Sequence, residues 1–401
     1  MNKKIALGAA IAFMAIVVAA TMALTRMWAL RSFNGKVNDL VNREERYSKL
    51  AMIDDMVREN YNGSIPQEGL MDAISQGFME GIGDPYAQYY SSTQYQRLQN
   101  EYSGKSVQIG IVEAKDDSGY ILVTEVYPDS PAMAAGIEAG DLIVKIDDMD
   151  VSADNYYEAI ANLRGEAGST VSLTIRRNNE DRELPNITRR FVETPSVSSE
   201  LLVDQIGLIR FSQFNNTTPD QFIKQVDALM DEGAIGLILD VRGVDTCTID
   251  PVADVLDKLL PAGELVYTSD KSNSLTVLKS SDAREVDLPM AVLINEKTTC
   301  EAELFAAVIR DYGKGRLVGV KTFGKGTVQR ILPLPDGSGA IRLTTALYLP
   351  PSQKSFDKEG IKPDFEVKMN EELMALPETD LQLLKAREVV AGMRKSSENG
   401  A

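Results

Sequence analysis

Apolar positions with helical spacing dominate the first hundred residues. Ile5–Thr25 contains no charge, and a run of that length can cross the hydrocarbon core of a membrane. From Phe33 to about Gln99, apolar residues recur every three or four positions, which is typical of amphipathic helices. The sequence Gly-Asp-Pro-Tyr at Gly83–Tyr86 ends this pattern sharply and is predicted to be a packing element.

A different pattern begins at Tyr102, where short apolar runs alternate with turn residues. Alternation with a period of two predicts strands, and Gly, Pro and Asp between the runs predict turns. The predicted strands are Ser106–Glu113, Tyr120–Val126, Leu142–Ile146 and Thr170–Arg177, and the predicted helices run from Ser130 to Gly136 and from Tyr156 to Leu163. The pattern predicts a compact domain of strands and helices over residues 101–190.

Beyond residue 190, strongly apolar strands alternate with amphipathic helices. The predicted strands are Gly207–Phe211, Gly236–Val241, Met290–Ile294, Leu317–Val320 and Ile341–Leu349, and the predicted helices are Thr218–Asp231, Ala302–Tyr312 and Pro377–Met393. Such alternation favours an α/β core, because helices between strands cover a parallel sheet. The fold class predicted for the whole chain is therefore α+β or α/β.

Composition excludes several kinds of chemistry. The chain has 401 residues, enough for two or three domains, and its formal net charge of −17 would repel nucleic acid. It contains no histidine, which excludes Ser-His-Asp and Cys-His mechanisms, and its two cysteines cannot form a four-cysteine zinc site. A hydrolase of this composition must use lysine or a carboxylate as its base, and we expect neither a metal nor another cofactor.

The candidate chemistry lies between residues 290 and 329. Cys300 stands between the apolar strand Met290–Ile294 and the helix that begins near Ala302, and hydrolases expose nucleophiles at such turns. Backbone N–H groups at a helix start can also hold a developing oxyanion. Beyond the next strand, the glycine-rich sequence Lys-Thr-Phe-Gly-Lys-Gly carries Lys325, 25 positions after Cys300 (325 − 300).

This stretch resembles the carboxy-terminal processing peptidases, or tail-specific proteases, which are serine–lysine enzymes with a PDZ domain. Their first motif is Asn-Glu-Gly-Ser-Ala-Ser-Ala-Ser-Glu, with the second serine as nucleophile, and their second motif supplies a lysine base and a glutamine that orients it. The matching residues are Asn295, Glu296 and Glu303 in the first motif and all of Lys321–Gln329 in the second. The resemblance covers roughly residues 45–390 and implies that Cys300, Lys325 and Gln329 are catalytic.

The same resemblance places an oxyanion loop after the strand that ends near Asp240. The family has Asp-Leu-Arg-x-Asn-Pro-Gly-Gly there, and a glycine N–H serves the oxyanion hole. This chain keeps Asp240 and Arg242, whereas Thr246 and Cys247 replace the two glycines. Side chains restrict positive φ and close backbone approach. The implied oxyanion residues are Thr246, Cys247 and Glu301, and two of them depart from the family pattern.

Each catalytic role has a plain structural alternative. A buried Lys325 would have a lowered pKa and could act as a base, whereas in open solvent it would be an ordinary loop lysine. Gln329 would share a face with Lys325 if the run between them is extended, or it is an ordinary polar strand residue. Cys300 belongs to an altered active peptidase, to an inactive tail-binding relative or to a redox-controlled enzyme, or it is an inert buried thiol. Glu301, beside the thiol, opposes the thiolate.

Residues 101–190 resemble a PDZ domain. Such domains bind a chain terminus as an added strand, and backbone N–H groups of a loop hold its carboxylate. The loop reads Gly104-Lys105-Ser106-Val107, and Lys105 either supplements the carboxylate site or is a solvated lysine. The resemblance therefore implies that these four residues bind peptide, and that the partners are proteins or peptides with free C-termini.

The apolar run near the N-terminus is interpreted as an uncleaved anchor, because it is long for the apolar region of a signal peptide. The alternative is a signal cleaved near Val18–Ala20. Balanced flanking charges leave the orientation open, and the resemblance places the bulk of the chain outside the cytoplasm. We expect a single-pass protein of the cell membrane, with a homodimer as a further candidate state.

The resemblance also brings the two cysteines together, because an oxyanion donor must reach the carbon that the nucleophile attacks. This leads to the hypothesis that Cys247 and Cys300 approach within disulfide reach, with Cα atoms closer than about 7 Å. The alternative is two unpaired thiols that replaced small residues. A disulfide, favoured outside the cytoplasm, would leave the peptidase inactive, as a permanent staple or as a switch.

The predicted organisation follows from these observations. It comprises a membrane anchor or signal (1–30), a helical segment (31–100), a PDZ domain (101–190), an α/β peptidase core of the ClpP/crotonase-like type (191–368), and a C-terminal helix and tail (369–401). The implied function is that of a membrane-anchored peptidase that recognises protein C-termini and cuts with a Cys300–Lys325 dyad. The alternative is an inactive or redox-gated relative that acts as a tail-binding scaffold.

Overall fold

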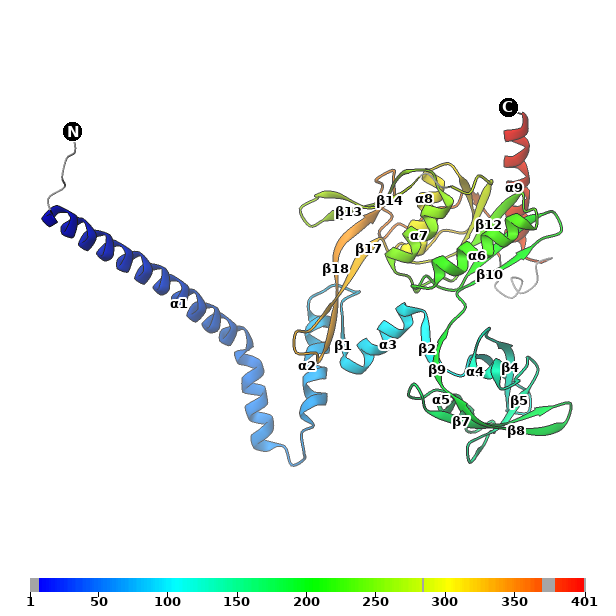
Figure 1. Ribbon diagram of the computed structural model, residues 1–401, viewed down its shortest axis with the longest axis horizontal. Helices are drawn as coiled ribbons and strands as arrows, with labels where there is room; N and C mark the ends of the chain where they lie inside the picture. Colours follow the sequence, from blue (N-terminus) through cyan, green and yellow to red (C-terminus); the bar gives the residue numbers. More distant parts are fainter. Residues whose placement is uncertain (1–6, 283–284, 370–378, 400–401) are drawn as a thin grey trace. The chain divides into compact units, whose positions relative to one another are not determined.

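The computed structural model describes residues 7–282, 285–369 and 379–399 (Figure 1). The chain divides into two units, residues 1–70 and 71–401. Helix α1 (Leu7–Asn60) makes up most of the first unit, and it contains one stretch, Ala12–Arg31, that is long and apolar enough to cross a membrane. A membrane anchor and a signal sequence both fit this stretch. The helix runs on without an end at the predicted boundary of residue 30.

A six-stranded sheet forms the centre of the second unit. Its order is β10 (Val197–Leu201), β11 (Ile206–Phe211), β12 (Gly236–Asp240), β15 (Met290–Ile294), β16 (Gly315–Gly319) and β19 (Phe365–Glu366). The strands from β11 to β19 are parallel, and β10 is antiparallel to β11. The carboxyl ends of the parallel strands therefore meet at one edge, which is where α/β sheets place their ligands.

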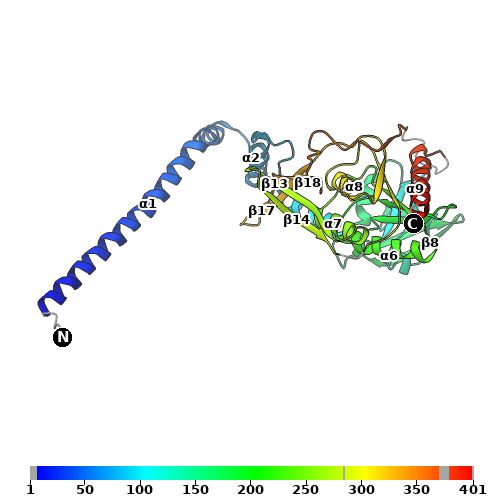
Figure 2. The ribbon, with the colours of Figure 1, turned by 90° about the horizontal axis from the view of Figure 1, so that it is seen from above.

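Helices cover both faces of this sheet (Figures 1 and 2). Helices α6 (Thr218–Asp231), α7 (Ile249–Leu259) and α8 (Glu301–Asp311) share one core with strand residues such as Leu237 and Leu239. Helix α9 (Leu381–Asn399) packs on the other face, against Ile238 and its neighbours. A parallel sheet buried on both faces needs apolar residues at successive positions, which is why β12 and β15 are buried throughout.

A second sheet includes the strand that follows the glycine-rich loop. Its order is β1 (Gln88–Ser91), β18 (Gly339–Leu349), β13 (Gly263–Asp270) and β14 (Leu275–Ser281), and β17 (Thr327–Pro333) also pairs with β18. Strand β1 lies between α2 (Gln67–Gly81) and α3 (Ser92–Ser103), and it pairs with the first residues of β18. The lead-in predicted to be helical therefore also contributes a strand to this sheet.

Residues 105–193 hold a separate sheet and two short helices. The sheet order is β3 (Ile111–Lys115), β4 (Ile121–Val126), β5 (Leu142–Ile146), β7 (Thr170–Arg177) and β8 (Glu180–Thr188), with β6 (Met149–Asp150) on β5; α4 (Pro131–Ala134) and α5 (Tyr156–Leu163) share its core. Strands β2 (Lys105–Gln108) and β9 (Arg190–Glu193) pair with each other where the chain enters and leaves this region. The single strand predicted over Ser106–Glu113 is wrong, because Gly110 turns the chain there at a φ of 88°.

Candidate active site

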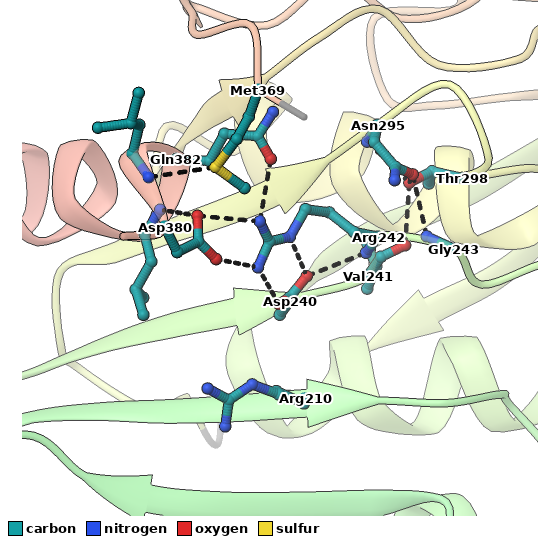
Figure 3. Close-up of polar contacts among 12 residues, drawn as sticks. Arg210, Asp240, Val241, Arg242, Gly243, Asn295, Thr298, Met369, Asp380 and Gln382 are labelled. Atoms are coloured by element: carbon teal, nitrogen blue, oxygen red, sulfur yellow. Dashed lines mark hydrogen bonds and ion pairs between the residues drawn. The ribbon is translucent and has the colours of Figure 1, made fainter. Parts of the chain in front are cut away.

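Cys300 occupies a strained turn at the start of α8. Its φ of 57° and ψ of −131° are uncommon for any residue other than glycine. Two side chains hold this turn (Figure 3): Thr298 Oγ1 donates to the Val241 carbonyl at 2.9 Å, and Asn295 Oδ1 accepts the Gly243 N–H at 2.9 Å. Such strain persists only where the surroundings fix it, and it is frequent at active sites.

A buried ion network lies at the end of β12 (Figure 3). The Arg242 Nη2 atom donates to Asp240 Oδ2 at 2.6 Å and to Asp380 Oδ2 at 2.8 Å, and its Nη1 atom donates to Gln382 at 3.0 Å. Burial alone would lower the pKa of Arg242, but the hydrogen bonds and charges of the two aspartates raise it. The network joins α9 to the start of the loop that leads to Cys247.

One pocket of about 310 Å³ collects the residues predicted for the catalytic centre and its oxyanion loop. Its lining includes Cys300, Lys325, Gln329, Thr246, Cys247 and Glu301. Apolar and aromatic side chains complete the walls, among them Tyr102 of α3, Ile249 of α7 and Tyr348 of β18. The pocket therefore brings together segments more than two hundred residues apart in the chain.

Glu303 fixes the lysine loop to the first turn of α8. Its fully buried carboxylate accepts the backbone N–H of Gly324 at 2.7 Å, the N–H of Lys325 at 2.8 Å and the hydroxyl of Thr322. Burial raises the pKa of Glu303, although these hydrogen bonds act to lower it. Glu303 lies one helical turn after Cys300. It therefore fixes the position of the Lys325 backbone relative to the Cys300 backbone.

The Cys300 thiol and the Lys325 amine interact across the pocket. Burial raises the pKa of Cys300, and the charge of Glu301 raises it further. The charge of Lys325 lowers that pKa, as do hydrogen bonds from the Thr299 hydroxyl, at 3.4 Å, and from Lys325 itself. The balance favours a protonated thiol at rest, so deprotonation needs a base beside it.

The Glu301 carboxylate interacts with its own backbone N–H, the group that follows Cys300 in the chain. Its carboxylate accepts its own backbone N–H and the Tyr348 hydroxyl, and its pKa is raised by burial in spite of these bonds and of the Lys325 charge. The N–H that follows a nucleophile at a helix start is a natural oxyanion donor. In this structure, the neighbouring carboxylate competes for it.

Cys247 lies in the same pocket, and both cysteines are free thiols in the structure. The Thr246 carbonyl accepts the Phe214 N–H at 2.9 Å, which holds the loop against the core. The pKa of Cys247 is raised well above its ordinary value by burial and by the charges of Glu301 and Cys300, whereas the Ala302 N–H lowers it.

The position of Gln329 in the pocket depends on the pairing of its strand and on two side-chain hydrogen bonds. Lys325 lies in the loop before β17, and the pairing of β17 with β18 shifts register between Val328 and Gln329. The Gln329 amide donates to Thr327 Oγ1 at 3.0 Å and to Thr344 Oγ1 at 2.7 Å. The pocket lining includes both Lys325 and Gln329, although only Gln329 lies within the strand.

The predicted peptide loop has a different environment from the one that the sequence implied. Gly104 caps α3 at a φ of 69°, and a Cβ atom there would meet Asn215 and Thr217 at 2.5 Å. Lys105, Ser106 and Val107 belong to β2, which pairs with β9. These four residues precede the turn at Gly110, whereas β3, the terminal strand of the PDZ-like sheet, follows that turn.

The Gly-Asp-Pro-Tyr turn was predicted to be a packing element, and the structure brings it to the site. The Lys325 Nζ atom lies 4.6 Å from the centroid of the Tyr86 ring. The only signal in the sequence was that the resemblance to the family, which covers roughly residues 45–390, includes this turn. Spacing along the chain could not reveal the contact, because it joins residues 239 positions apart (325 − 86).

Two family models match the chain. The model for peptidase family S41 matches residues 205–367, and the model for the PDZ domain matches residues 122–177.

Curated relatives match over most of their length. One is the carboxy-terminal processing protease CtpA of Bacillus subtilis, 30% identical over 328 residues, which are 81% of this chain and 70% of that protein. Another is the carboxyl-terminal-processing protease of a Picosynechococcus species, 32% identical over 317 residues, 77% of this chain and 76% of the relative. Among solved structures, a putative S41 protease from Bacteroides fragilis shares the fold, with a TM-score of 0.53 at 17% identity over 85% of this chain and 97% of that one.

Proposed function

Because this chain belongs to peptidase family S41 and carries a PDZ domain, we propose that it is a membrane-anchored peptidase that recognises protein C-termini and cuts with Cys300 as nucleophile and Lys325 as base. The observation that supports this proposal most directly is that Cys300 and Lys325 line one pocket, where the charge of Lys325 acts to lower the pKa of the thiol.

The chemistry proceeds in two halves. Lys325 takes the thiol proton, and the thiolate sulfur bonds to the scissile carbonyl carbon, whose oxygen becomes an oxyanion beside the N-terminus of α8. The Lys325 ammonium then gives its proton to the leaving amine as the C–N bond breaks. Water, deprotonated by Lys325, releases the acyl group from sulfur and regenerates the thiol.

Tail recognition is assigned to the terminal strand of the PDZ sheet. In the part of the chain that the structure describes, β3 pairs on one side only, with β4. An extended peptide can add to the open side, and backbone N–H groups near Gly110 can receive its carboxylate. This moves the proposed groove from Gly104–Val107 to Gln108–Lys115.

The apolar stretch Ala12–Arg31 would hold the protein in the cell membrane as a single-pass span, with the remainder outside the cytoplasm.

A second candidate function is a tail-binding scaffold without peptidase activity. The observation in its favour is the Glu301 carboxylate, which accepts the backbone N–H that an oxyanion would use. A negative charge there opposes both the thiolate and the oxyanion.

The test uses the full chain in detergent micelles, incubated with a chemically unfolded protein. We expect cleavage by the wild type and a loss of at least about 100-fold in Lys325→Ala, as for removal of a general base. Lys321→Ala, an exposed lysine of the same loop, is the matched control and should cleave as the wild type does.

Peptides with free and amidated C-termini give the second measurement. Cleavage that survives in Lys325→Ala would contradict the dyad. No cleavage by any variant, together with binding that requires a free carboxylate, would favour the scaffold.

A further inference from the structure

The turn between α2 and β1 contacts the wall of the pocket through a short chain of hydrogen bonds. The Asp84 carboxylate accepts the Tyr86 N–H at 3.0 Å, the Thr344 N–H at 2.9 Å and the Thr344 hydroxyl at 3.1 Å. Thr344 lies on β18, and its hydroxyl also contacts Gln329 Nε2 at 2.7 Å. Asp84 is therefore two hydrogen bonds away from a residue that lines the pocket.

The direction of each hydrogen bond in this chain is determined by chemistry. An ionised carboxylate can only accept, so the single hydroxyl hydrogen of Thr344 points to Asp84. The Thr344 oxygen must then accept from Gln329, which has to present its NH₂ group there. Thr327 Oγ1, 3.0 Å from the same nitrogen, is the second acceptor for that group.

This arrangement commits the amide nitrogen to Thr327 and Thr344 and leaves the amide oxygen free for another donor. Among the described residues, Gln329 Oε1 is buried and has no hydrogen-bond partner. Gln329 lines the pocket together with Lys325 and Cys300. A buried amide oxygen without a donor is costly, and an amine is the donor that the pocket offers.

We propose that Asp84 is a positioning residue for the Cys300–Lys325 dyad: by accepting the Thr344 hydroxyl, it turns the Gln329 amide so that its oxygen faces the Lys325 amine. The proposal rests on the proposed function. A neutral amine has two N–H bonds and one lone pair. When Gln329 Oε1 and the Tyr86 ring take the N–H bonds, the lone pair is free to face the thiol.

The ionisation of Asp84 agrees with this role. Burial alone would raise the pKa of Asp84, but hydrogen bonds from Thr344 and Tyr86 and the charge of Arg342 lower it below its ordinary value. The carboxylate therefore stays an acceptor at neutral pH, and it keeps the Thr344 hydroxyl pointing in one direction.

Two substitutions interrupt the series of hydrogen bonds from Asp84 through Thr344 to Gln329 in different ways. Asp84→Asn places an NH₂ group beside the Thr344 hydroxyl. This group can donate to the hydroxyl oxygen, which reverses the direction of the hydrogen bonds. Thr344→Val removes the hydroxyl and keeps the shape. We expect each to lower kcat by about 10- to 100-fold while KM changes little, because the amine is misdirected and substrate binding is not. Thr344→Ser restores the hydroxyl and should recover activity.

A second readout does not depend on peptidase activity. The rate of alkylation of Cys300 by iodoacetamide, resolved by mass spectrometry over a range of pH, reports its thiolate. We expect Asp84→Asn and Thr344→Val to shift this pH profile in the same direction as Lys325→Ala. Asp72→Asn is the matched control, since Asp72 lies in the same lead-in and accepts the Tyr89 hydroxyl at 2.7 Å, outside the pocket lining.

The outcomes separate the two proposals. If Lys325→Ala shifts the alkylation profile and both Asp84→Asn and Thr344→Val leave it unchanged, the positioning role is overturned and the dyad stands. If Lys325→Ala itself leaves the profile unchanged, the dyad is overturned and the positioning role with it. Should Asp84→Asn fail to fold, the comparison of Thr344→Val with Thr344→Ser decides alone.

Discussion

Glu301 opposes the reactivity of its neighbour. Its charge raises the pKa of the Cys300 thiol, after burial the largest cause of that shift. The family motif that this stretch resembles has alanine at the matching position. Its effect depends on pH, because the pKa of Glu301 is itself raised by burial and the charge is present only above that value.

Removing this charge should make Cys300 more reactive. Glu301→Gln lowers the pKa of the thiol, so at a given pH more thiolate is present, and we expect alkylation to be faster by about 3- to 10-fold. The acceleration should be largest between the pKa of Glu301 and the pKa of Cys300, and it should vanish above the pKa of the thiol, where both proteins carry the thiolate. It should shrink as the pH falls through the raised pKa of Glu301, where the wild-type side chain is already neutral.

Glu296→Gln is the control for this prediction, because Glu296 is an exposed residue of the same turn. Equal alkylation rates for Glu301→Gln and the wild type across the whole pH range would show that the carboxylate does not act on the thiol.

The two cysteines give a second prediction at this scale. The charge of a Cys300 thiolate raises the pKa of Cys247, and both cysteines line the same pocket. We expect a two-electron oxidant such as oxidised glutathione to join Cys247 to Cys300, with loss of two protons and two electrons. Alkylation with and without reductant, read by mass spectrometry, measures the bridge.

Protein purified from its native compartment without reductant is the deciding sample. Two freely alkylated cysteines there would refute the bridge. Activity that appears only after reduction would identify the bridge as a switch rather than a staple.

The candidate catalytic residues illustrate what a local motif can and cannot predict. The motif placed Lys325 and Gln329 in the site, and both line the pocket. Contacts to Glu303 fix the loop at Lys325, and pairing with β18 shifts the register before Gln329. Such contacts join distant segments, and no period along the chain encodes them.

At the scale of elements, the ion network at Arg242 connects the C-terminal helix to the start of the loop that leads to Cys247. Arg242 and its two aspartates are nearly fully buried. Removing one partner of a buried ion pair leaves a charge without compensation. The orientation of the loop from Arg242 to Cys247 therefore depends on α9.

Asp380→Ala should loosen α9. We expect the free energy of opening of this helix, measured by hydrogen exchange, to fall by about 3 kcal/mol, since the Arg242 charge loses a buried partner. Thiol reactivity of Cys247 should rise with it, because the loop gains freedom.

The exposed pair of Lys385 and Glu388 on the same helix supplies the control. Glu388→Gln should change the free energy of opening by less than about 1 kcal/mol. If Asp380→Ala opened α9 no more readily than Glu388→Gln, the network would not be what holds the helix.

Elements with a regular buried face were predicted well from the sequence. The bounds of β5, β7, α5, α6 and β15 agree with the predicted ranges. Strands β1 and β14 carry no such pattern: β1 is a short Gln-Tyr-Tyr-Ser segment, and the apolar residues Leu275, Val277 and Leu278 of β14 are exposed. Pairing with β18 and β13 determines both strands, and pairing partners far along the chain are not visible in a local window.

For the molecule as a whole, attachment to the membrane is expected to depend on the first unit. Deleting residues 1–30 should release a folded protein into the soluble fraction, because it removes Ile5–Thr25 and nearly all of the apolar stretch. Fractionation of cells, followed by thermal unfolding of the released protein, measures both halves of this prediction. A full-length chain found soluble, with its N-terminus near residue 21, would instead identify a cleaved signal.

The pairing of β1 with β18 has a consequence for dividing this protein into parts. A fragment that began at residue 191, where the sequence places the start of the peptidase core, would lose β1 and leave Gly339–Arg342 of β18 without its neighbour on that side. Open strand edges recruit strands from other copies. The isolated core would therefore associate edge to edge and precipitate. Strand β1, which precedes the PDZ domain in the chain, protects the peptidase core from aggregation.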